Sequence, residues 1–382
     1  MAKLQKTVVI TGCDTRSSYA YELALRLDEQ GYTVFAGCTD CNSVGARSLA
    51  SRGSTALAIL QIDVTKPNEI NNAVEMIEDS VGEEGVWALV NCAEVFSVAE
   101  VDWCPIEDYE KSIQVNLLGT IRITKSLLHL VRRARGRIVN LSSIAGCLAR
   151  AGQSAYSLTK FALEAFSDSL RQEMLKWGVF VILVEPAYFP VGQSILCESN
   201  INISLGTVPK NLRDVYGDDY FVDFINTVTD TANSQSAAGT GEPSSTPVTS
   251  PSRKQVSQHG SPVSTTSSAT SGYSSASSTL KSSLDGEKAN PKTDSVTDVK
   301  GETFSTLKNR GTPNLSNTNR VLHALVEAVS APSPKVRYFV GSFQDRMIKS
   351  LAPILPTMVM DTYLTSGQMS KVIPKLIKEK IE

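Results

Sequence analysis

Short runs of β-branched and apolar residues alternate along this chain with longer segments in which apolar residues recur at three- and four-residue spacing. The first pattern is typical of buried strands and the second of amphipathic helices. We predict seven strands, at residues 7–11, 33–37, 56–62, 87–91, 137–141, 180–184 and 336–340. We predict helices at residues 18–29, 43–52, 67–80, 106–133 and 155–177. Strands that alternate with helices indicate βαβ units, so the expected fold is α/β with a doubly wound parallel sheet.

A segment rich in serine and threonine interrupts this alternation. Ser and Thr fill 20 of the 40 positions from 241 to 280, with almost no large apolar side chains among them. Such a segment cannot bury enough apolar surface to offset the entropy lost on ordering, so we expect disorder over residues 226–319. The chain is then one Rossmann-type domain, with its main part at 1–225, a long disordered Ser/Thr-rich insertion at 226–319, and its last helix, strand and apolar segment at 320–382.

Composition argues against several classes of function. The formal net charge is −2 and no run of Lys and Arg is long enough to form a nucleic-acid-binding stripe, so no nucleic acid partner is expected. The seven cysteines show no paired zinc-type spacing and the three histidines lie far apart, so neither a metal site nor a Ser-His-Asp triad is expected. Because a strand begins at residue 7, we expect no signal peptide or membrane anchor before the fold, and a cytoplasmic location.

The first candidate site follows the first predicted strand. The sequence TGCDTRSS at 11–18 leads from that strand into the first helix. Free N–H groups and the helix dipole at such a turn attract phosphate groups, and glycines let the backbone approach them closely. Of the glycines expected in such a loop, only Gly12 is present. Taken alone, the segment is equally consistent with an ordinary strand-to-helix turn.

The second candidate site pairs Tyr156 with Lys160, four residues later on one helix face. A free tyrosine has a pKa near 10, which is too high for a base at neutral pH, but a nearby ammonium favours the phenolate. Ser143 closes the strand at 137–141 and lies 13 residues before Tyr156. A strand end and the next helix are therefore expected to converge on one substrate oxygen.

These pieces, in this order and at this spacing, resemble the short-chain dehydrogenase/reductase family. The resemblance covers about residues 5–199 and resumes near residue 320, which leaves the Ser/Thr-rich segment outside it. Its motifs are TGCDTRSS for the family's TGxxxGxG, Asp63-Val64 after the third strand, NCAE at 91–94 for NNAG, Asn116 in QVNLLGT, Ser143 in LSSIAG, and YSLTK at 156–160. The segments AGC at 36–38, FSDSLRQEM at 166–174 and VEPAYF at 184–189 are further similar to the branch of retinol, hydroxysteroid and 3-hydroxybutyrate dehydrogenases.

The resemblance implies a role for each of four catalytic residues. Tyr156 would be the general acid/base, and Lys160 would lower the pKa of Tyr156 and bind the nicotinamide ribose. Ser143 would hold the substrate oxygen, and Asn116 would position a water of the proton relay. The expected activity is therefore that of an NAD(P)-dependent oxidoreductase that interconverts an alcohol and a carbonyl.

The resemblance also implies a cofactor cleft at the strand ends. Asp63 and Val64 would border the adenine, Asn91 and Ala93 would line the cleft, and residues 184–188 would approach the nicotinamide. The expected cofactor-binding residues are Gly12, Asp14, Arg16, Ser18, Thr39, Asp63, Val64, Asn91, Ala93, Tyr156, Lys160, Pro186 and Tyr188.

Four positions depart from the family pattern. Arg16 and Ser18 replace the second and third loop glycines, Glu94 replaces the last glycine of NNAG, and Ala187 replaces the glycine of the usual PG motif. Side chains at 16 and 18 would crowd the pyrophosphate, and Glu94 would add a negative charge to the same cleft. We therefore predict reduced affinity for the dinucleotide.

The choice between NAD and NADP depends on the end of the second strand. That position holds Cys38, Thr39 and Asp40, so no arginine is available for a 2′-phosphate and Asp40 would repel one. NAD(H) is therefore favoured and NADP(H) remains the alternative, with Arg16 as the residue that would reverse the preference.

The substrate is less constrained. Aromatic residues follow the sixth strand, where the family builds its substrate lid, at Tyr188, Phe189, Tyr216, Tyr220, Phe221 and Phe224. They suit a small apolar alcohol or ketone of steroid or retinoid type, although their spacing is also typical of packing residues. The apolar segment 347–364 contains Pro353 and Pro356 and is too broken to span a bilayer. We expect it to cover the substrate pocket, to touch a membrane surface as a peripheral contact, or to contact another subunit.

Two other functions stay open. A non-catalytic member of the family would keep the fold and serve as a binding or scaffold protein, as the lost glycines suggest. A dehydrogenase for a short hydroxy acid such as 3-hydroxybutyrate would need a positive residue in its pocket. The resemblance further implies a homodimer or homotetramer through the helices at 106–133 and 155–177.

Overall fold

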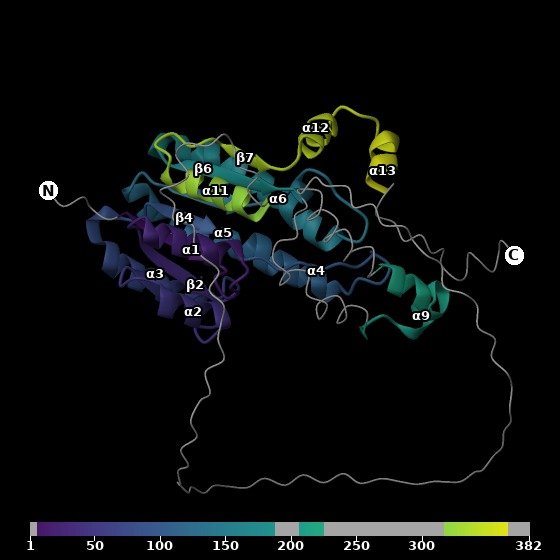
Figure 1. The fold of residues 1–382 in the computed structure, drawn as a ribbon, viewed down its shortest axis with the longest axis horizontal. Helices are drawn as coiled ribbons and strands as arrows, with labels where there is room; N and C mark the ends of the chain where they lie inside the picture. The colour runs from purple at the N-terminus through teal and green to yellow at the C-terminus, as the bar shows by residue number, and fades with distance from the viewer. Residues whose placement is uncertain (1–5, 188–205, 225–316, 366–382) are drawn as a thin grey trace, which may run out of the picture. The chain divides into compact units, whose positions relative to one another are not determined.

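The computed structural model describes residues 6–187, 206–224 and 317–365 (Figure 1). Seven parallel strands form one sheet in the order β3-β2-β1-β4-β5-β6-β7. Their bounds are β1 Thr7–Thr11, β2 Thr33–Cys38, β3 Leu57–Gln61, β4 Ala88–Asn91, β5 Arg137–Leu141, β6 Phe180–Pro186 and β7 Arg337–Val340. Each predicted strand is present with its ends shifted by at most two residues, and the doubly wound parallel sheet is confirmed.

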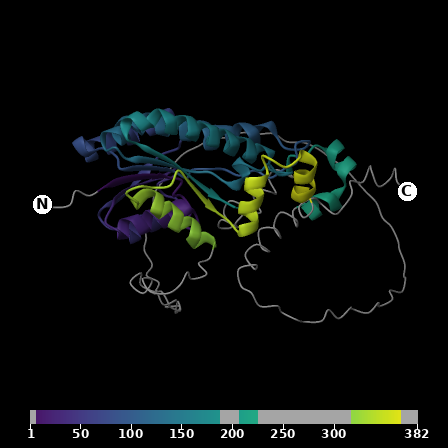
Figure 2. The same cartoon turned by 90° about the horizontal axis from the view of Figure 1, so that it is seen from above.

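Helices cover both faces of the sheet (Figure 2). One face carries α1 Tyr19–Glu29, α2 Val44–Arg52 and α11 Asn317–Ser330, and the other carries α3 Pro67–Val81, α5 Thr120–Arg133 and α6 Ser154–Met174. Alternate residues of β1 show why two layers are needed, since Val8 and Ile10 belong to the first core cluster and Val9 to the second. A parallel strand buried on both faces reads as a continuous apolar run, as TVVIT does.

The helix expected over 106–133 is not continuous. It consists of α4 Ile106–Ser112, a π-helical segment η2 Ile113–Gly119, and α5. A π-helical turn inside a helix is frequent at functional sites, because it shifts one side chain out of the regular register. Here the segment contains Asn116, whose side chain is buried.

The chain completes the sheet after the Ser/Thr-rich segment. Helix α11 begins at Asn317, three residues inside the predicted end of the insertion; residues 226–316 of that prediction lie outside the described residues. Arg137 of β5 donates to the carbonyl oxygens of Ala328 and Ala331 at the end of α11, at 3.1 and 2.8 Å. Trp87 adds a hydrogen bond of 3.0 Å from its indole nitrogen to the carbonyl oxygen of Val329. These bonds fix α11 against the sheet.

Shorter elements complete the described part. They are the 3₁₀ turns η1 Gly82–Glu84, η3 Ile144–Gly146 and η4 Leu175–Trp177, and the helices α9 Lys210–Tyr216, α12 Phe343–Leu351 and α13 Thr357–Thr365. One side of α12 and α13 packs against Ile144 and Leu148 through Ile348 and Met360. Among the residues that the structure describes, no helix has both the length and the apolar character needed to cross a bilayer.

Candidate active site

A cleft lies at the carboxyl ends of the strands on either side of β1. The sheet order places β2 on one side of β1 and β4 on the other, so the direction of the crossovers reverses there. In doubly wound sheets this reversal is where ligands bind. The cleft has a volume of about 630 Å³. It brings together seven of the expected cofactor residues, namely Gly12, Asp14, Ser18, Thr39, Asp63, Val64 and Ala93.

The loop after β1 keeps one essential glycine and closes on itself. Gly12 has a φ of +85°, and a Cβ there would lie 2.9 Å from the Cα of Ala93, so no other residue fits without strain. Ser18 is the N-cap of α1; its hydroxyl accepts from the amide of Tyr21 at 3.2 Å and donates to the carbonyl of Gly12 at 3.3 Å. The serine that replaces a family glycine therefore turns its side chain into the loop. Arg16 is exposed and is not among the residues lining the cleft.

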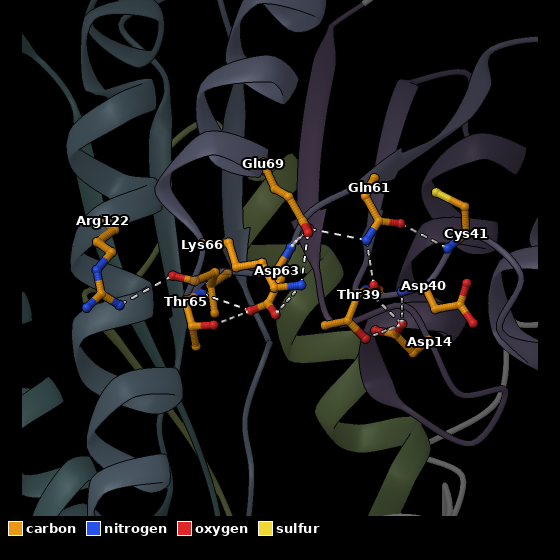
Figure 3. Close-up of polar contacts among 11 residues, drawn as sticks. Asp14, Thr39, Asp40, Cys41, Gln61, Asp63, Thr65, Lys66, Glu69 and Arg122 are labelled. Carbon is orange, nitrogen blue, oxygen red and sulfur yellow. Dashed lines mark hydrogen bonds and ion pairs between the residues drawn. The ribbon is translucent and has the colours of Figure 1, made fainter. Parts of the chain in front are cut away.

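Asp14 joins this loop to the end of β2 (Figure 3). Its Oδ1 accepts three hydrogen bonds, from the amide and the hydroxyl of Thr39, both at 2.8 Å, and from the amide of Asp40 at 3.1 Å. The predicted residues Asp14 and Thr39 thus form one acidic corner of the cleft.

A second acidic group follows β3 in the same view (Figure 3). Asp63 accepts from the amide and hydroxyl of Thr65 at 2.9 and 2.7 Å, and Lys66 lies 3.3 Å from Asp63 and 3.0 Å from Glu69. Partial burial alone would raise the pKa of Asp63, but the hydrogen bonds from Thr65 and Lys66 outweigh it and hold that pKa below its ordinary value. Asp63 is therefore a carboxylate at neutral pH.

The catalytic candidates meet at the other end of the cleft. Lys160 of α6 donates to the carbonyl oxygen of Leu141 at the end of β5, at 2.7 Å, and forms an ion pair of 2.7 Å with Oε2 of Glu94. The hydroxyl of Tyr156 donates to the same Oε2 at 3.1 Å. The side chain of Lys160 is 2% exposed and that of Glu94 is 11% exposed. One buried carboxylate oxygen therefore holds both members of the Tyr–Lys pair.

The side chain of Asn116 forms hydrogen bonds with the backbone of Val95, the residue after Glu94. Its Oδ1 accepts from the amide of Val95 at 2.8 Å, and its Nδ2 donates to the carbonyl of Val95 at 2.9 Å and to the hydroxyl of Thr159 at 3.2 Å. The π-helical segment makes this possible by directing Asn116 inward between the β4 loop and α6. Asn116 is thus linked to the Tyr–Lys pair indirectly, through Val95, the neighbour of Glu94, and through Thr159, the neighbour of Lys160.

The other predicted site residues lie near the Tyr–Lys pair or outside the described residues. Ser143 is buried and accepts from the amide of Ala145 at 3.1 Å, which caps η3. Asn91 lies behind the cleft, where its Nδ2 donates to Asn140 at 2.8 Å. Pro186 ends β6, and Tyr188, like Phe189, lies outside the described residues.

Two aromatic residues near this site were not predicted as site residues from the sequence. The ring of Phe96 contacts that of Tyr156 edge to face, with 4.6 Å between the centroids. Tyr19 lines the cleft, and its buried hydroxyl has no hydrogen-bond partner in the described part of the chain. Burial, with a smaller contribution from the charge of Glu94, raises the pKa of Tyr19. The position of Tyr19, directly after the helix cap, was a usable signal; Phe96 lies in a loop and gave none.

These residues suit a dinucleotide. The N-terminus of α1 and the tight turn at Gly12 suit a pyrophosphate, and the carboxylates of Asp14 and Asp63 suit the hydroxyl groups of a nucleoside. The buried hydroxyl of Tyr19 is a further polar atom of the cleft, and it has no hydrogen-bond partner among the described residues.

Comparisons with known proteins agree with this geometry. The family model described as short chain dehydrogenase matches residues 6–194. The bovine mitochondrial D-beta-hydroxybutyrate dehydrogenase is 41% identical over 225 residues, which are 56% of this chain and 65% of that protein. The rat 17-beta-hydroxysteroid dehydrogenase type 6 is 40% identical over 225 residues, 58% of this chain and 69% of the relative. The mouse estradiol 17-beta-dehydrogenase 2 is 39% identical over 220 residues, 56% of this chain and 57% of the relative.

The residues matched by the family model carry strands β1 to β6, the cleft and the Tyr–Lys pair. The chain covers slightly less than two thirds of the length of the hydroxybutyrate dehydrogenase and slightly more than two thirds of the type 6 hydroxysteroid dehydrogenase. The resemblance seen in the sequence motifs is confirmed, and the chain belongs to the short-chain dehydrogenase family.

Proposed function

We propose that this protein is an NAD(H)-dependent oxidoreductase that interconverts an alcohol and a carbonyl on a small, lipid-like substrate of steroid or retinoid type. The observation that carries the proposal is the meeting of Tyr156, Lys160 and Asn116 beside a cleft whose other end is lined by nucleotide-type groups. The names of the hydroxysteroid dehydrogenases among the relatives support this class of substrate, whereas the D-beta-hydroxybutyrate dehydrogenases support a short hydroxy acid as the alternative.

Each site residue has a distinct part in the proposed reaction. The bound dinucleotide supplies or accepts the hydride at the substrate carbon. Tyr156 exchanges the proton with the substrate oxygen, Ser143 holds that oxygen through its hydroxyl, and Lys160 holds its ammonium at the end of β5 through Leu141. The edge of Phe96 against the Tyr156 ring restricts the ring and keeps its hydroxyl in one place.

The preference for NAD(H) follows from the charges in Figure 3. The carboxylates of Asp14 and Asp63 line this end of the cleft, and Asp40 and Glu69 lie next to them. The cations drawn with them are engaged, since Lys66 pairs with Asp63 and Glu69, and Arg122 donates to Gln114 at 2.6 Å. An added 2′-phosphate would meet like charges, which cost several kcal/mol when placed close together.

Titration of the full chain with NADH and NADPH, followed by fluorescence, tests the proposal. We expect NADH to bind at least about tenfold more tightly than NADPH, which corresponds to about 1.4 kcal/mol. Competition by AMP and by 2′,5′-ADP separates the adenosine end from the rest of the site. Tighter binding of NADPH would refute the NAD(H) preference, and saturation by neither nucleotide at millimolar concentration would refute the oxidoreductase.

The apolar substrate is supported by a cluster of aromatic side chains beyond the Tyr–Lys pair. Trp103 contacts Phe221 and Phe224 with centroid distances of 5.6 and 5.1 Å, and Phe96 packs against the same cluster. Lys111 of α4 also lines the cleft, so a short hydroxy acid is the alternative that a substrate screen must include. Turnover of steroid or retinoid alcohols with NAD, absent in a Tyr156→Phe variant, is the expected result.

A second candidate function is a non-catalytic binding protein. The contact of Glu94 with both Tyr156 and Lys160 favours this candidate, because Glu94 occupies the two side chains that would otherwise bind a ligand. Binding of NADH without turnover of any substrate in the screen would support this candidate.

The C-terminal helices suit a peripheral contact with a lipid surface. Their outer side exposes Phe343, Ile354 and Met358 by 80%, 78% and 82%, while the inner side packs near the site. Flotation with liposomes tests the contact, and a protein that stays at the bottom of the gradient would exclude it. The homodimer or homotetramer remains a prediction that sedimentation equilibrium would check.

A further inference from the structure

Glu94 separates the cleft from the Tyr–Lys pair. Glu94 and Phe96 are among the residues that line the cleft, whereas Tyr156 and Lys160 are not. The two catalytic candidates are correspondingly buried, with 7% and 2% of their surface exposed. A ligand that enters the cleft therefore meets the Glu94 carboxylate before it meets the pair.

Glu94 occupies the side of the Lys160 ammonium that faces the cleft. A lysine ammonium has three donors, and one of them is held by the carbonyl oxygen of Leu141, a fixed backbone atom at the end of β5. The contact on the side of the cleft is the 2.7 Å ion pair with Glu94. Any hydroxyl group of a ligand that is to bind Lys160 from the cleft must displace this carboxylate.

The same carboxylate holds the proton of Tyr156. The phenol donates to Oε2 of Glu94 at 3.1 Å, and that oxygen also accepts from Lys160. While this arrangement lasts, the phenol proton is directed at Glu94 and not at a substrate oxygen. Glu94 therefore engages the hydroxyl of Tyr156 and the ammonium of Lys160 through one carboxylate oxygen.

The release of Glu94 has to be a side-chain motion. Asn116 binds both the amide and the carbonyl of Val95, so the backbone next to Glu94 is fixed. Tyr19 offers a second position for the carboxylate, because its hydroxyl is buried in the same cleft and has no hydrogen-bond partner among the described residues. Glu94 and Tyr19 line the same cleft, and the charge of Glu94 contributes to the raised pKa of Tyr19.

We propose that Glu94 is a positioning residue that closes the Tyr156–Lys160 pair, and that it moves from Lys160 to the hydroxyl of Tyr19 when a dinucleotide occupies the cleft. The proposal rests on the function proposed above. It predicts that the cofactor binds only the open arrangement, so the apparent dissociation constant is raised by the inverse of the open fraction. An open fraction of about one tenth would weaken binding about tenfold.

Two variants and two ligands test the closure in the full chain. Glu94→Gln keeps the shape and removes the charge, and Glu94→Gly removes the side chain. In the proposed arrangement NADH would extend to Lys160, whereas AMP would occupy the adenosine end alone. We expect both variants to bind NADH about tenfold more tightly than the parent protein and AMP within about twofold of it.

Asp108→Asn is the matched charge control. Asp108 lines the same cleft, but its carboxylate is not the partner of Lys160. If Asp108→Asn tightens NADH binding as much as Glu94→Gln does, the effect is general repulsion and the proposal is wrong. Equal affinity for NADH in the parent and both Glu94 variants would also overturn it.

A double-mutant cycle tests the role of Tyr19. Tyr19→Phe should weaken NADH binding about fivefold in the parent protein, because the displaced carboxylate loses its partner, and should have no effect in the Glu94→Gly background. An equal loss in both backgrounds would mean that Tyr19 binds the ligand itself, which contradicts the proposed movement.

The outcomes separate this proposal from the proposed function. Folding of each variant is checked by circular dichroism and thermal unfolding. If no folded variant binds NADH or NADPH, the oxidoreductase function fails and the closure fails with it. If the parent binds NADH in the low micromolar range and the Glu94 variants match it, the function stands and the closure alone is refuted.

Discussion

The ion pair between Lys160 and Glu94 should be measurable as a coupling in the free energy of unfolding, without any cofactor. Replacing Lys160 by Met keeps the length of the side chain, so the packing cost is small. The change leaves the carbonyl of Leu141 without its 2.7 Å donor and leaves Glu94, 11% exposed, without its cation. Removing one partner of a buried pair typically costs about 3–5 kcal/mol, and we expect about 3 kcal/mol because Glu94 keeps some contact with water.

Neutralising Glu94 should recover most of this loss. In the Lys160→Met background, Glu94→Gln removes the charge that lacks a partner, and we expect it to restore about 2 kcal/mol. Urea denaturation of the parent, both single variants and the double variant gives the coupling energy. Lys66→Met is the matched control: its side chain is 58% exposed and also pairs with carboxylates, so its loss should cost far less than the loss of Lys160.

Additive single effects would refute this reasoning. If the Lys160→Met and Glu94→Gln effects add within about 0.5 kcal/mol, the two side chains are not paired in solution. The closure proposed for Glu94 would then lose its structural basis, whatever the affinity for the cofactor.

Three further outcomes are expected. Tyr156→Phe should lower kcat by about 10²–10⁴-fold in a protein that still binds NADH, since the phenol of Tyr156 moves the proton in the proposed reaction. Steady-state kinetics and titration measure the two effects, and retained turnover would contradict the role. Arg137→Met should lower the free energy of unfolding by about 3 kcal/mol, because two carbonyl oxygens of α11 lose charged donors; a loss below about 1 kcal/mol would mean that α11 is held by packing alone. The pKa of Asp63 is lowered in the folded protein, so its carboxylate stabilises the fold above the unfolded pKa of about 3.9, and this stability is lost as the pH falls through the folded pKa. Asp63→Asn should therefore flatten the fall in the free energy of unfolding between about pH 5 and pH 2. An unchanged slope would show that Asp63 is not held by Thr65.

Local pattern in the sequence determined most of the fold. The strands at 7–11 and 137–141 were predicted to the residue, because each is built around β-branched residues, VVI in the first and IV in the second, that are typical of a buried strand. The helix over 106–133 was predicted as continuous, since its apolar spacing is helical throughout. The π-helical turn at Ile113–Gly119 was not foreseen, because its hydrogen-bond shift is set by what Asn116 contacts on other segments.

The site divides in the same way. The sequence by itself identified Tyr156, Lys160 and Asn116, and it marked Glu94 as a negative charge near the cofactor, because motif spacing fixes which elements carry these residues. Only the tertiary structure decided that Glu94 lies 2.7 Å from Lys160 and that Tyr19 lines the same cleft. Such contacts depend on how the loop after β4, α1 and α6 pack together at the end of the sheet. The periodicity of one segment indicates which of its side chains are buried, but it does not indicate which side chain of another segment each of them contacts.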